Sequence, residues 1–132
     1  MSFILDTDIC SAFLKGNPVV WQHCMQHNGQ LSVSVITVAE LFTWALRATA
    51  TPKRLQKLLD FLADVTLLDI TPEVGRRFGE LDAGMLDVGQ RAPPMDLLIA
   101  ATAILHNLTV VTHNVKDFSR VPGLTVVDWS KP

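Results

Sequence analysis

Residues 2–6 read Ser-Phe-Ile-Leu-Asp, an apolar run closed by a carboxylate, and this stretch decides the fold that the sequence predicts. A short apolar run is typical of a buried strand, above all of one in a parallel sheet. We expect a helix to follow directly, from residue 7 to about residue 15. The chain therefore opens with a strand, an acidic residue and a helix, in that order.

The same alternation of strands and helices continues along the chain, which favours an α/β fold with a parallel sheet. The helix that begins near Asp96 is apolar on nearly all sides, so we expect it to be buried in the centre of the fold. The predicted strands are 2–6, 31–34, 66–70, 109–112 and 124–127, and the predicted helices are about 7–15, 18–28, 37–49, 53–64, 71–90 and 95–106.

Composition indicates a single globular domain over residues 1–132. Hydrophobic residues make up 48% of the 132 residues, enough for an ordinary core. The net charge of −2 does not indicate nucleic-acid binding, although local clusters of charge can matter more than the net charge. We find no signal peptide or membrane span, and Cys10 and Cys24 are expected to be free buried thiols. These features predict a cytoplasmic protein that does not associate with membranes.

Four acidic residues stand where a parallel sheet would gather them. Asp6 and Asp117 follow predicted strands, whereas Glu40 and Asp96 lie early in predicted helices. Each alone has an ordinary explanation: a helix cap, a turn, an exposed glutamate, or a partner for the helix dipole. Ligands of open α/β sheets bind beyond the carboxyl ends of the strands. Four carboxylates meeting there would repel one another unless a cation lay between them, and a hard divalent cation is the simplest one.

The segments that carry these acids resemble the PIN-domain ribonucleases, and specifically the VapC toxins of toxin–antitoxin pairs. The resemblance spans almost the whole chain in the order and spacing of that family. It implies a three-layer PIN-like fold whose five-stranded parallel sheet has the order 3-2-1-4-5. The matching segments are Phe3-Ile4-Leu5-Asp6-Thr7, residues 34–41 (SVITVAEL), residues 94–103 (PMDLLIAATA) and residues 110–118 (VVTHNVKDF).

The resemblance also implies the chemistry, which is hydrolysis of RNA phosphodiester bonds assisted by Mg²⁺ or Mn²⁺. Asp6 and Asp96 would be the firmest metal ligands, Glu40 would ligate or orient the attacking water, and Asp117 would hold a second ion or the water network. Thr112 and Asn114 resemble the polar pair that supports the site. Asp8 is a departure, because relatives often carry an uncharged asparagine there. It is expected to be an outer ligand or a residue that starts a helix.

Two kinds of partner follow from the resemblance: a second copy of the chain and a VapB-type antitoxin, through which alone the toxin would reach operator DNA. The antitoxin would cover the first helices and the site. We expect its apolar groove to involve Phe13, Leu14, Val20 and Trp21, although ordinary core packing explains the same residues.

Other interpretations remain open at this point. Asp6-Thr7-Asp8 after an apolar strand resembles the opening of haloacid-dehalogenase phosphatases, but that interpretation leaves Glu40 and Asp96 without roles. The fold could also serve as a binding module without catalysis. His113, at the edge of the expected site, could assist proton transfer or be an exposed surface residue. The sequence does not identify the RNA.

Overall fold

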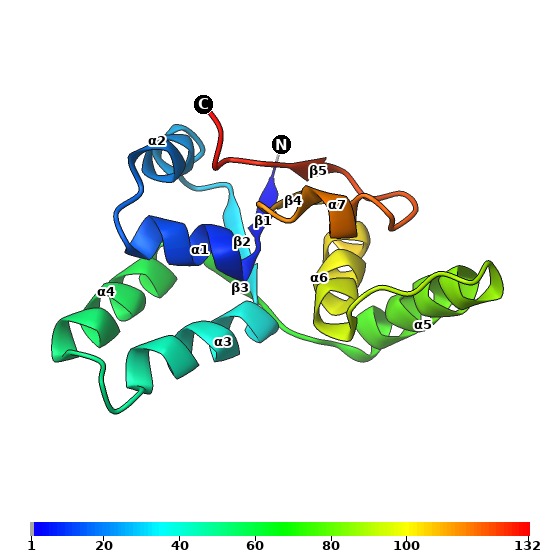
Figure 1. Cartoon of the computed structure of the whole chain (residues 1–132), viewed down its shortest axis with the longest axis horizontal. Coiled ribbons are helices and arrows are strands. Elements are labelled where there is room, and N and C mark those ends of the chain that lie inside the picture. Colours follow the sequence, from blue (N-terminus) through cyan, green and yellow to red (C-terminus); the bar gives the residue numbers. More distant parts are fainter. Residues whose placement is uncertain (1) are drawn as a thin grey trace.

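A computed structural model describes residues 2–132 and places five strands in one sheet (Figure 1). All neighbouring strands are parallel, and their order is β3-β2-β1-β4-β5, as the resemblance implied. Strand order reverses between β1 and β4, so a cleft for ligands is expected beyond the carboxyl ends of these two strands. The strands are β1 (Phe3–Leu5), β2 (Leu31–Ser34), β3 (Thr66–Leu68), β4 (Thr109–Val111) and β5 (Val126–Val127).

Helices cover both faces of the sheet and complete a three-layer architecture. In Figure 1, α1 to α4 lie on one side of the strands and α5 to α7 on the other. Their bounds are α1 (Thr7–Leu14), α2 (Pro18–Gln26), α3 (Val35–Leu46), α4 (Pro52–Ala63), α5 (Pro72–Asp87), α6 (Pro94–Leu105) and α7 (Val115–Phe118).

The period of two residues along β1 separates the two hydrophobic cores. Phe3 and Leu5 belong to the core beneath α1 to α4, whereas Ile4 belongs to the core beneath α5 to α7. All three side chains are buried. A strand that is covered on both faces must be apolar at every position, which explains the unbroken run at the start of the chain.

The apolar helix predicted near residue 95 is buried as expected. Six of its residues are shielded from solvent: Leu97, Ile99, Ala100, Ala101, Thr102 and Ala103. Pro94 occupies its first turn, where the missing N–H costs nothing. Burial fixes the direction of α6, so that Asp96 in its first turn is held at one end of the sheet. No helix within residues 2–132 has the length and apolar character needed to cross a membrane.

The structure differs from the prediction mainly at the ends of elements. The helix predicted from residue 37 begins at Val35, because the Ser34 side chain caps it directly after β2 by accepting the N–H of Ile36 at 3.0 Å. Glu40 therefore lies in the middle of α3 and not in its first turn. The last strand is shorter than predicted, and the short helix α7 was not predicted.

Candidate metal centre

Asp6 is the most rigidly held of the four predicted carboxylates. It follows β1 directly and caps α1, and only 8% of the residue is exposed. Its Oδ1 accepts the backbone N–H of Thr7 at 2.8 Å, and its Oδ2 accepts the hydroxyl of Thr112 at 2.8 Å. Both oxygens are thus oriented by atoms of the fold. The helix-cap role and the site role coincide in this one residue.

The carboxylates raise one another's proton affinity, which shows that the fold brings them together. Burial, followed by the charge of Asp8, raises the pKa of Asp6 from 3.8 to about 6, although hydrogen bonds from Thr112 and Thr7 oppose this shift. The pKa of Asp96 is also raised, by burial first and then by the charges of Asp117, Glu40 and Asp8. Desolvated like charges of this kind favour either protonation or a bound cation.

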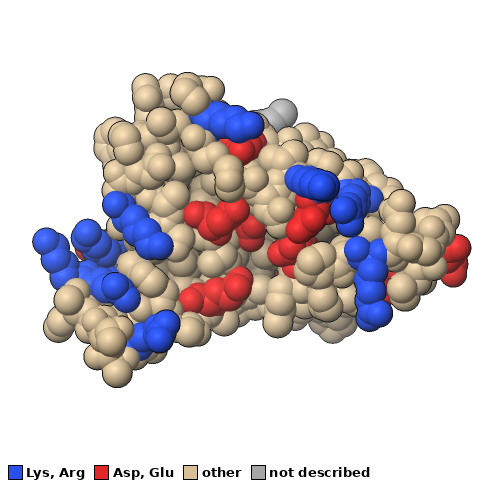
Figure 2. Space-filling model, in the orientation of Figure 1, with Lys and Arg blue, Asp and Glu red and all other residues tan. Residues whose placement is uncertain are grey.

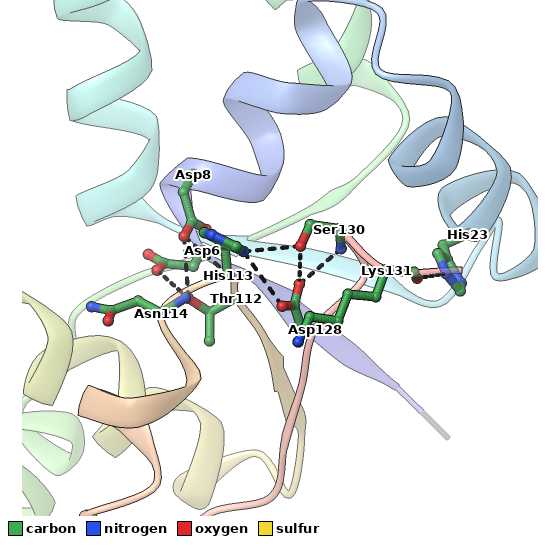
Figure 3. Close-up of polar contacts among 9 residues, drawn as sticks. All are labelled: Asp6, Asp8, His23, Thr112, His113, Asn114, Asp128, Ser130 and Lys131. Atoms are coloured by element: carbon green, nitrogen blue, oxygen red, sulfur yellow. Dashed lines mark hydrogen bonds and ion pairs between the residues drawn. The ribbon is translucent and has the colours of Figure 1, made fainter.

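Thr112 and Asn114, which the resemblance suggested as supporting residues, hydrogen-bond to two of the predicted carboxylates (Figure 3). The Thr112 hydroxyl donates to Asp6 and accepts the backbone N–H of Asn114 at 2.9 Å. The Asn114 amide Nδ2 in turn donates to Oδ2 of Asp117 at 2.9 Å. A continuous chain of hydrogen bonds therefore links Asp6, directly after β1, to Asp117 on α7.

Asp8 contributes a fifth carboxylate with an unsatisfied oxygen. Its Oδ2 accepts the backbone N–H of His113 at 3.1 Å and lies 3.4 Å from the Thr112 hydroxyl. Its Oδ1 is buried and has no hydrogen-bond partner among residues 2–132. Burial raises the pKa of Asp8 as well. An unpaired buried carboxylate oxygen is costly, and a cation or a water bound to a cation would satisfy it.

The donor set suits a hard divalent cation, because all of the converging ligands are oxygens. Among residues 2–132, no three Asp, Glu, His or Cys side chains are close enough to hold one ion directly. Mg²⁺ fits this spacing, since it keeps several waters and is commonly bound through one or two carboxylates. The residues present therefore fit a partly hydrated ion within a wider ring of negative charge.

Sequence reasoning missed Thr7, whose hydroxyl holds Glu40, and Thr37, which contacts Thr7. The Thr7 hydroxyl donates to Oε1 of Glu40 at 2.7 Å and lies 3.2 Å from the hydroxyl of Thr37. Thr37 precedes Glu40 by three residues, which places both on the same face of α3. That spacing, together with the position of Thr7 directly after Asp6, was the available signal.

A contact with the end of the chain was also missed. Figure 3 shows His113 beside Asp128 and Ser130, which follow β5. His113 Nδ1 lies 2.9 Å from Ser130 Oγ and 3.4 Å from Asp128 Oδ2. Burial raises the pKa of Asp128, but hydrogen bonds from Ser130 and the nearby His113 together outweigh it, so this pKa lies below its usual range. The His113 ring is therefore anchored to the end of the chain, its backbone N–H donates to Asp8, and 69% of its side chain is exposed.

Most of the residues predicted for a partner groove line one cavity. Three of the four predicted residues, Phe13, Leu14 and Trp21, line a cavity of about 380 Å³. The fourth residue, Val20, does not line the cavity, because its side chain is 0% exposed and packs in the core between α2 and the sheet. We call this cavity the apolar groove, and its further lining includes Cys24, Met25, Leu31, Phe61 and Val65, with Lys57, Asp60 and Asp64 among its polar residues.

Comparison with known proteins gives one consistent result. The family model described as "PIN domain" matches residues 3–124. The chain is 30% identical over 131 residues to a protein of Shigella flexneri named "tRNA(fMet)-specific endonuclease VapC", covering 98% of this chain and 99% of the relative. It is 32% identical over 130 residues to "Ribonuclease VapC2" of Haemophilus influenzae, covering 98% of each.

Solved structures show the same similarity. VapBC2 from Rickettsia felis, bound to a DNA fragment from its promoter, aligns with a TM-score of 0.89 at 29% identity, covering 98% of this chain and 99% of that one. DNA-bound VapBC from Salmonella typhimurium aligns with a TM-score of 0.90 at 28% identity and covers 98% of each chain. The matched segment contains Asp6, Glu40, Asp96 and Asp117.

Proposed function

Because the chain belongs to the PIN domain family, we propose that it is a divalent-metal-dependent endoribonuclease and the toxin of a VapBC-type toxin–antitoxin pair. The observation that carries the proposal is the group of desolvated carboxylates around Asp6 and Asp96, with the orphaned oxygen of Asp8 beside them. The match over residues 3–124 includes Glu40 and Asp96, which a phosphatase of the haloacid-dehalogenase type would leave unused.

The residues divide into those that hold the ion and those that arrange water. Asp6 and Asp96 would ligate it, with Asp117 and Glu40 bridged to it by water. A bound divalent cation supplies an acidified water and neutralises charge on the phosphate during in-line displacement. We propose Mg²⁺ as this ion, with Mn²⁺ able to replace it.

Glu40 is the residue that would orient the attacking water. Thr7 fixes its Oε1 at 2.7 Å, so the carboxylate enters the site in a defined orientation and not as a mobile side chain. Asn114 fixes Asp117 in the same way from the opposite side. Such positioning lowers the entropic cost of bringing water, phosphate and carboxylate into line.

The partners proposed for this chain follow from its relatives. Solved neighbours are complexes named VapBC, and two of them are bound to DNA. We propose that this chain likewise binds a VapB-type antitoxin through the apolar groove and reaches DNA only through that antitoxin. Residues 1–132 would form one PIN domain that assembles as a homodimer and acts in the cytoplasm.

A cleavage assay on purified, antitoxin-free protein tests the proposal. Single-stranded RNA and structured RNA would be incubated with Mg²⁺, with Mn²⁺ or with a chelator. The relative from Shigella flexneri is named for tRNA(fMet), so initiator tRNA is the first structured substrate to include. We expect cleavage that requires metal and disappears in Asp96→Asn.

The matched control is Asp87→Asn, which removes an exposed carboxylate at the end of α5 and should leave cleavage unchanged. Full activity in Asp96→Asn would contradict the metal centre. If the unaltered chain neither cleaves RNA nor binds metal, the fold serves as a binding module instead.

A further inference from the structure

A second charged feature lies beside the metal centre, and the proposed chemistry does not use it. A cavity of about 240 Å³ opens where the end of α1, the end of α3 and the start of α4 meet. Its charged residues are all cations, and no carboxylate lines it. We call it the basic pocket, and its lining is Leu14, Lys15, Trp44, Thr51, Lys53, Arg54 and Lys57.

The cations of this pocket form no ion pair with the carboxylates of residues 2–132. Within residues 2–132, ion pairs closer than 4.0 Å join only Arg77 to Glu80 and His113 to Asp128. The four cations of the basic pocket therefore have no carboxylate partner at that distance. Like charges gathered in a concave surface repel one another and raise the local positive potential, which attracts an anion.

Arg54 is held ready for such an anion. Its guanidinium carbon lies 4.8 Å from the centre of the Trp44 ring, and its Nη1 donates to the Trp44 carbonyl at 3.2 Å. Stacking and one hydrogen bond fix the plane of the guanidinium while leaving other N–H donors available. A fixed planar fork of this kind matches the two oxygens of a phosphate.

The basic pocket is continuous along α1 with the acidic centre, our name for the carboxylates of the metal centre: Asp6, Asp8, Glu40, Asp96 and Asp117. A shallow depression beside this helix is lined by Asp8, Ser11, Ala12, Lys15, Gly16 and Asn17, so Asp8 stands at one end and Lys15 at the other. Lys15 follows Asp8 by seven positions along α1, a rise of about 10 Å. Lys15 also lines the basic pocket. Figure 2 shows the acidic side chains in the centre of this face, with Lys and Arg gathered to their left over the region of α4.

A ring of carboxylates on a chain of net charge −2 repels RNA, so nearby cations must supply the attraction. We propose that the basic pocket binds the phosphate backbone of the RNA substrate, on the side of the metal centre reached along α1. This inference rests on the proposed ribonuclease function. Backbone contacts of this kind would set affinity and direct the strand towards the carboxylates without reading bases.

Binding can be measured without cleavage in the Asp96→Asn background. The probe is a fluorescein-labelled single-stranded RNA of mixed sequence and about 16 nucleotides, the upper end of site sizes for single-strand binders. Adding Lys53→Gln and Lys57→Gln should raise the Kd about 10-fold at low salt. The slope of log K against log salt should become shallower by about 1.4, because two phosphate contacts are lost.

Two further variants separate a binding role from a structural one. Arg76→Gln with Arg77→Gln removes the same charge from α5 and should change the Kd by less than about twofold, since these residues lie far from α4 and Glu73 and Glu80 already accompany them. Arg54→Lys keeps the charge but loses the planar fork. It should weaken binding about threefold and leave the salt slope unchanged.

Unchanged RNA affinity in the Lys53/Lys57 variant, together with metal-dependent cleavage by the unaltered chain, would overturn the basic pocket and leave the ribonuclease proposal standing. Failure of the unaltered chain to cleave RNA and of the Asp96→Asn chain to bind it would remove both. If RNA binding is unchanged while binding of poly-L-glutamate is lost, the pocket serves an acidic protein segment and our inference is wrong.

Discussion

The acidic centre and the apolar groove share one helix but are built in opposite ways. α1 gives Asp8 to the acidic centre near its start and Phe13 and Leu14 to the groove at its end. Residues distant in sequence form the acidic centre, and short hydrogen bonds hold them against mutual repulsion. The groove is the space between the sides of helices, and its apolar lining has no comparable network.

This difference predicts different responses to substitution. The acidic centre gathers carboxylates that repel one another. Removing one charge should therefore abolish RNA cleavage and reduce this repulsion in the folded state. The groove spreads its binding energy over several side chains, so one substitution there should weaken a partner without disturbing the fold. The four predictions below test this contrast.

The largest effect is expected for Asp6→Asn. A carboxamide has nearly the same shape but no charge for the cation, so cleavage should fall by about 1,000-fold or more. The same variant should not be less stable than the parent near neutral pH, because burial of the Asp6 charge is unfavourable without metal. Cleavage rates with Mg²⁺ and urea unfolding in chelator measure the two properties. Retained cleavage, or a loss of several kcal/mol in stability, would contradict this assignment.

The second effect is a dependence of metal-free stability on pH. The folded chain holds a proton on Asp6 up to about pH 6, whereas the unfolded chain releases it near 3.8. Between these values the unfolded state binds fewer protons, so this residue makes the free energy of unfolding fall as pH rises. Above about pH 6, the free energy of unfolding should be about 3 kcal/mol lower than below pH 3.8 on account of this residue.

Urea unfolding between about pH 4 and about pH 7, with chelator present, measures this fall. The comparison with Asp6→Asn isolates the residue, because Asp8 and Asp96 also have raised pKa values and act in the same direction. Mg²⁺ should restore stability to the parent at the upper end of the range. If the two proteins show the same pH dependence, the buried charge of Asp6 is not its cause.

The third effect is expected for Trp21→Asp in the apolar groove. Trp21 is 52% exposed, so Trp21→Asp should lower the free energy of unfolding by only about 1–2 kcal/mol and leave the fold intact. The affinity for the cognate antitoxin should fall about 30-fold, as expected for a large aromatic residue at the centre of an interface. Metal-dependent cleavage should be unchanged. Val88→Asp is the control, because Val88 is an exposed apolar residue outside the groove. Equal affinities for Trp21→Asp and the parent would exclude the groove as the antitoxin site.

The contrast between the two regions also explains what the sequence could predict. Strand ends can be predicted from the sequence, because an apolar run followed by an acidic residue indicates both the strand and the edge of the sheet where the acidic residue lies. The gathering of Asp6 and Asp96 was predictable for this reason. The strand order, in contrast, came from family resemblance. The supporting pair Thr112 and Asn114 came from family resemblance and not from spacing.

The buried side chains of a helix were harder to predict from the sequence, because their burial depends on which neighbouring element covers each face. Val20 and Trp21 are adjacent and both apolar, yet one is in the core and the other is half exposed. Only the packing of α2 against the sheet distinguishes them. Phe61 lines the groove from α4, and nothing local to its sequence indicates that α4 lies across from α1. The tail residues Asp128 and Ser130 were missed because their contact with His113 spans the fold.

The smallest effect is expected for Thr112→Val, which keeps the shape of the side chain and removes its hydroxyl. Asp6 would lose a donor at 2.8 Å and the Asn114 N–H would lose its acceptor at 2.9 Å. Leaving these buried groups unpaired should lower the free energy of unfolding by about 1–2 kcal/mol. Cleavage should fall about 10-fold, because Asp6 would be oriented less well towards the ion.

Two variants distinguish this positioning role from a general loss of stability. Thr112→Ser keeps the hydroxyl and should recover most of the cleavage. Thr102→Val removes a buried hydroxyl that donates to the Leu98 carbonyl at 2.8 Å, within α6 and away from the carboxylates, so it should leave cleavage intact. Should Thr112→Val and Thr102→Val prove equally active, the hydrogen bond to Asp6 would have no part in arranging the acidic centre. Asp6 and Asp8 would then be held by the backbone alone, through the N–H of Thr7 at Asp6 and of His113 at Asp8.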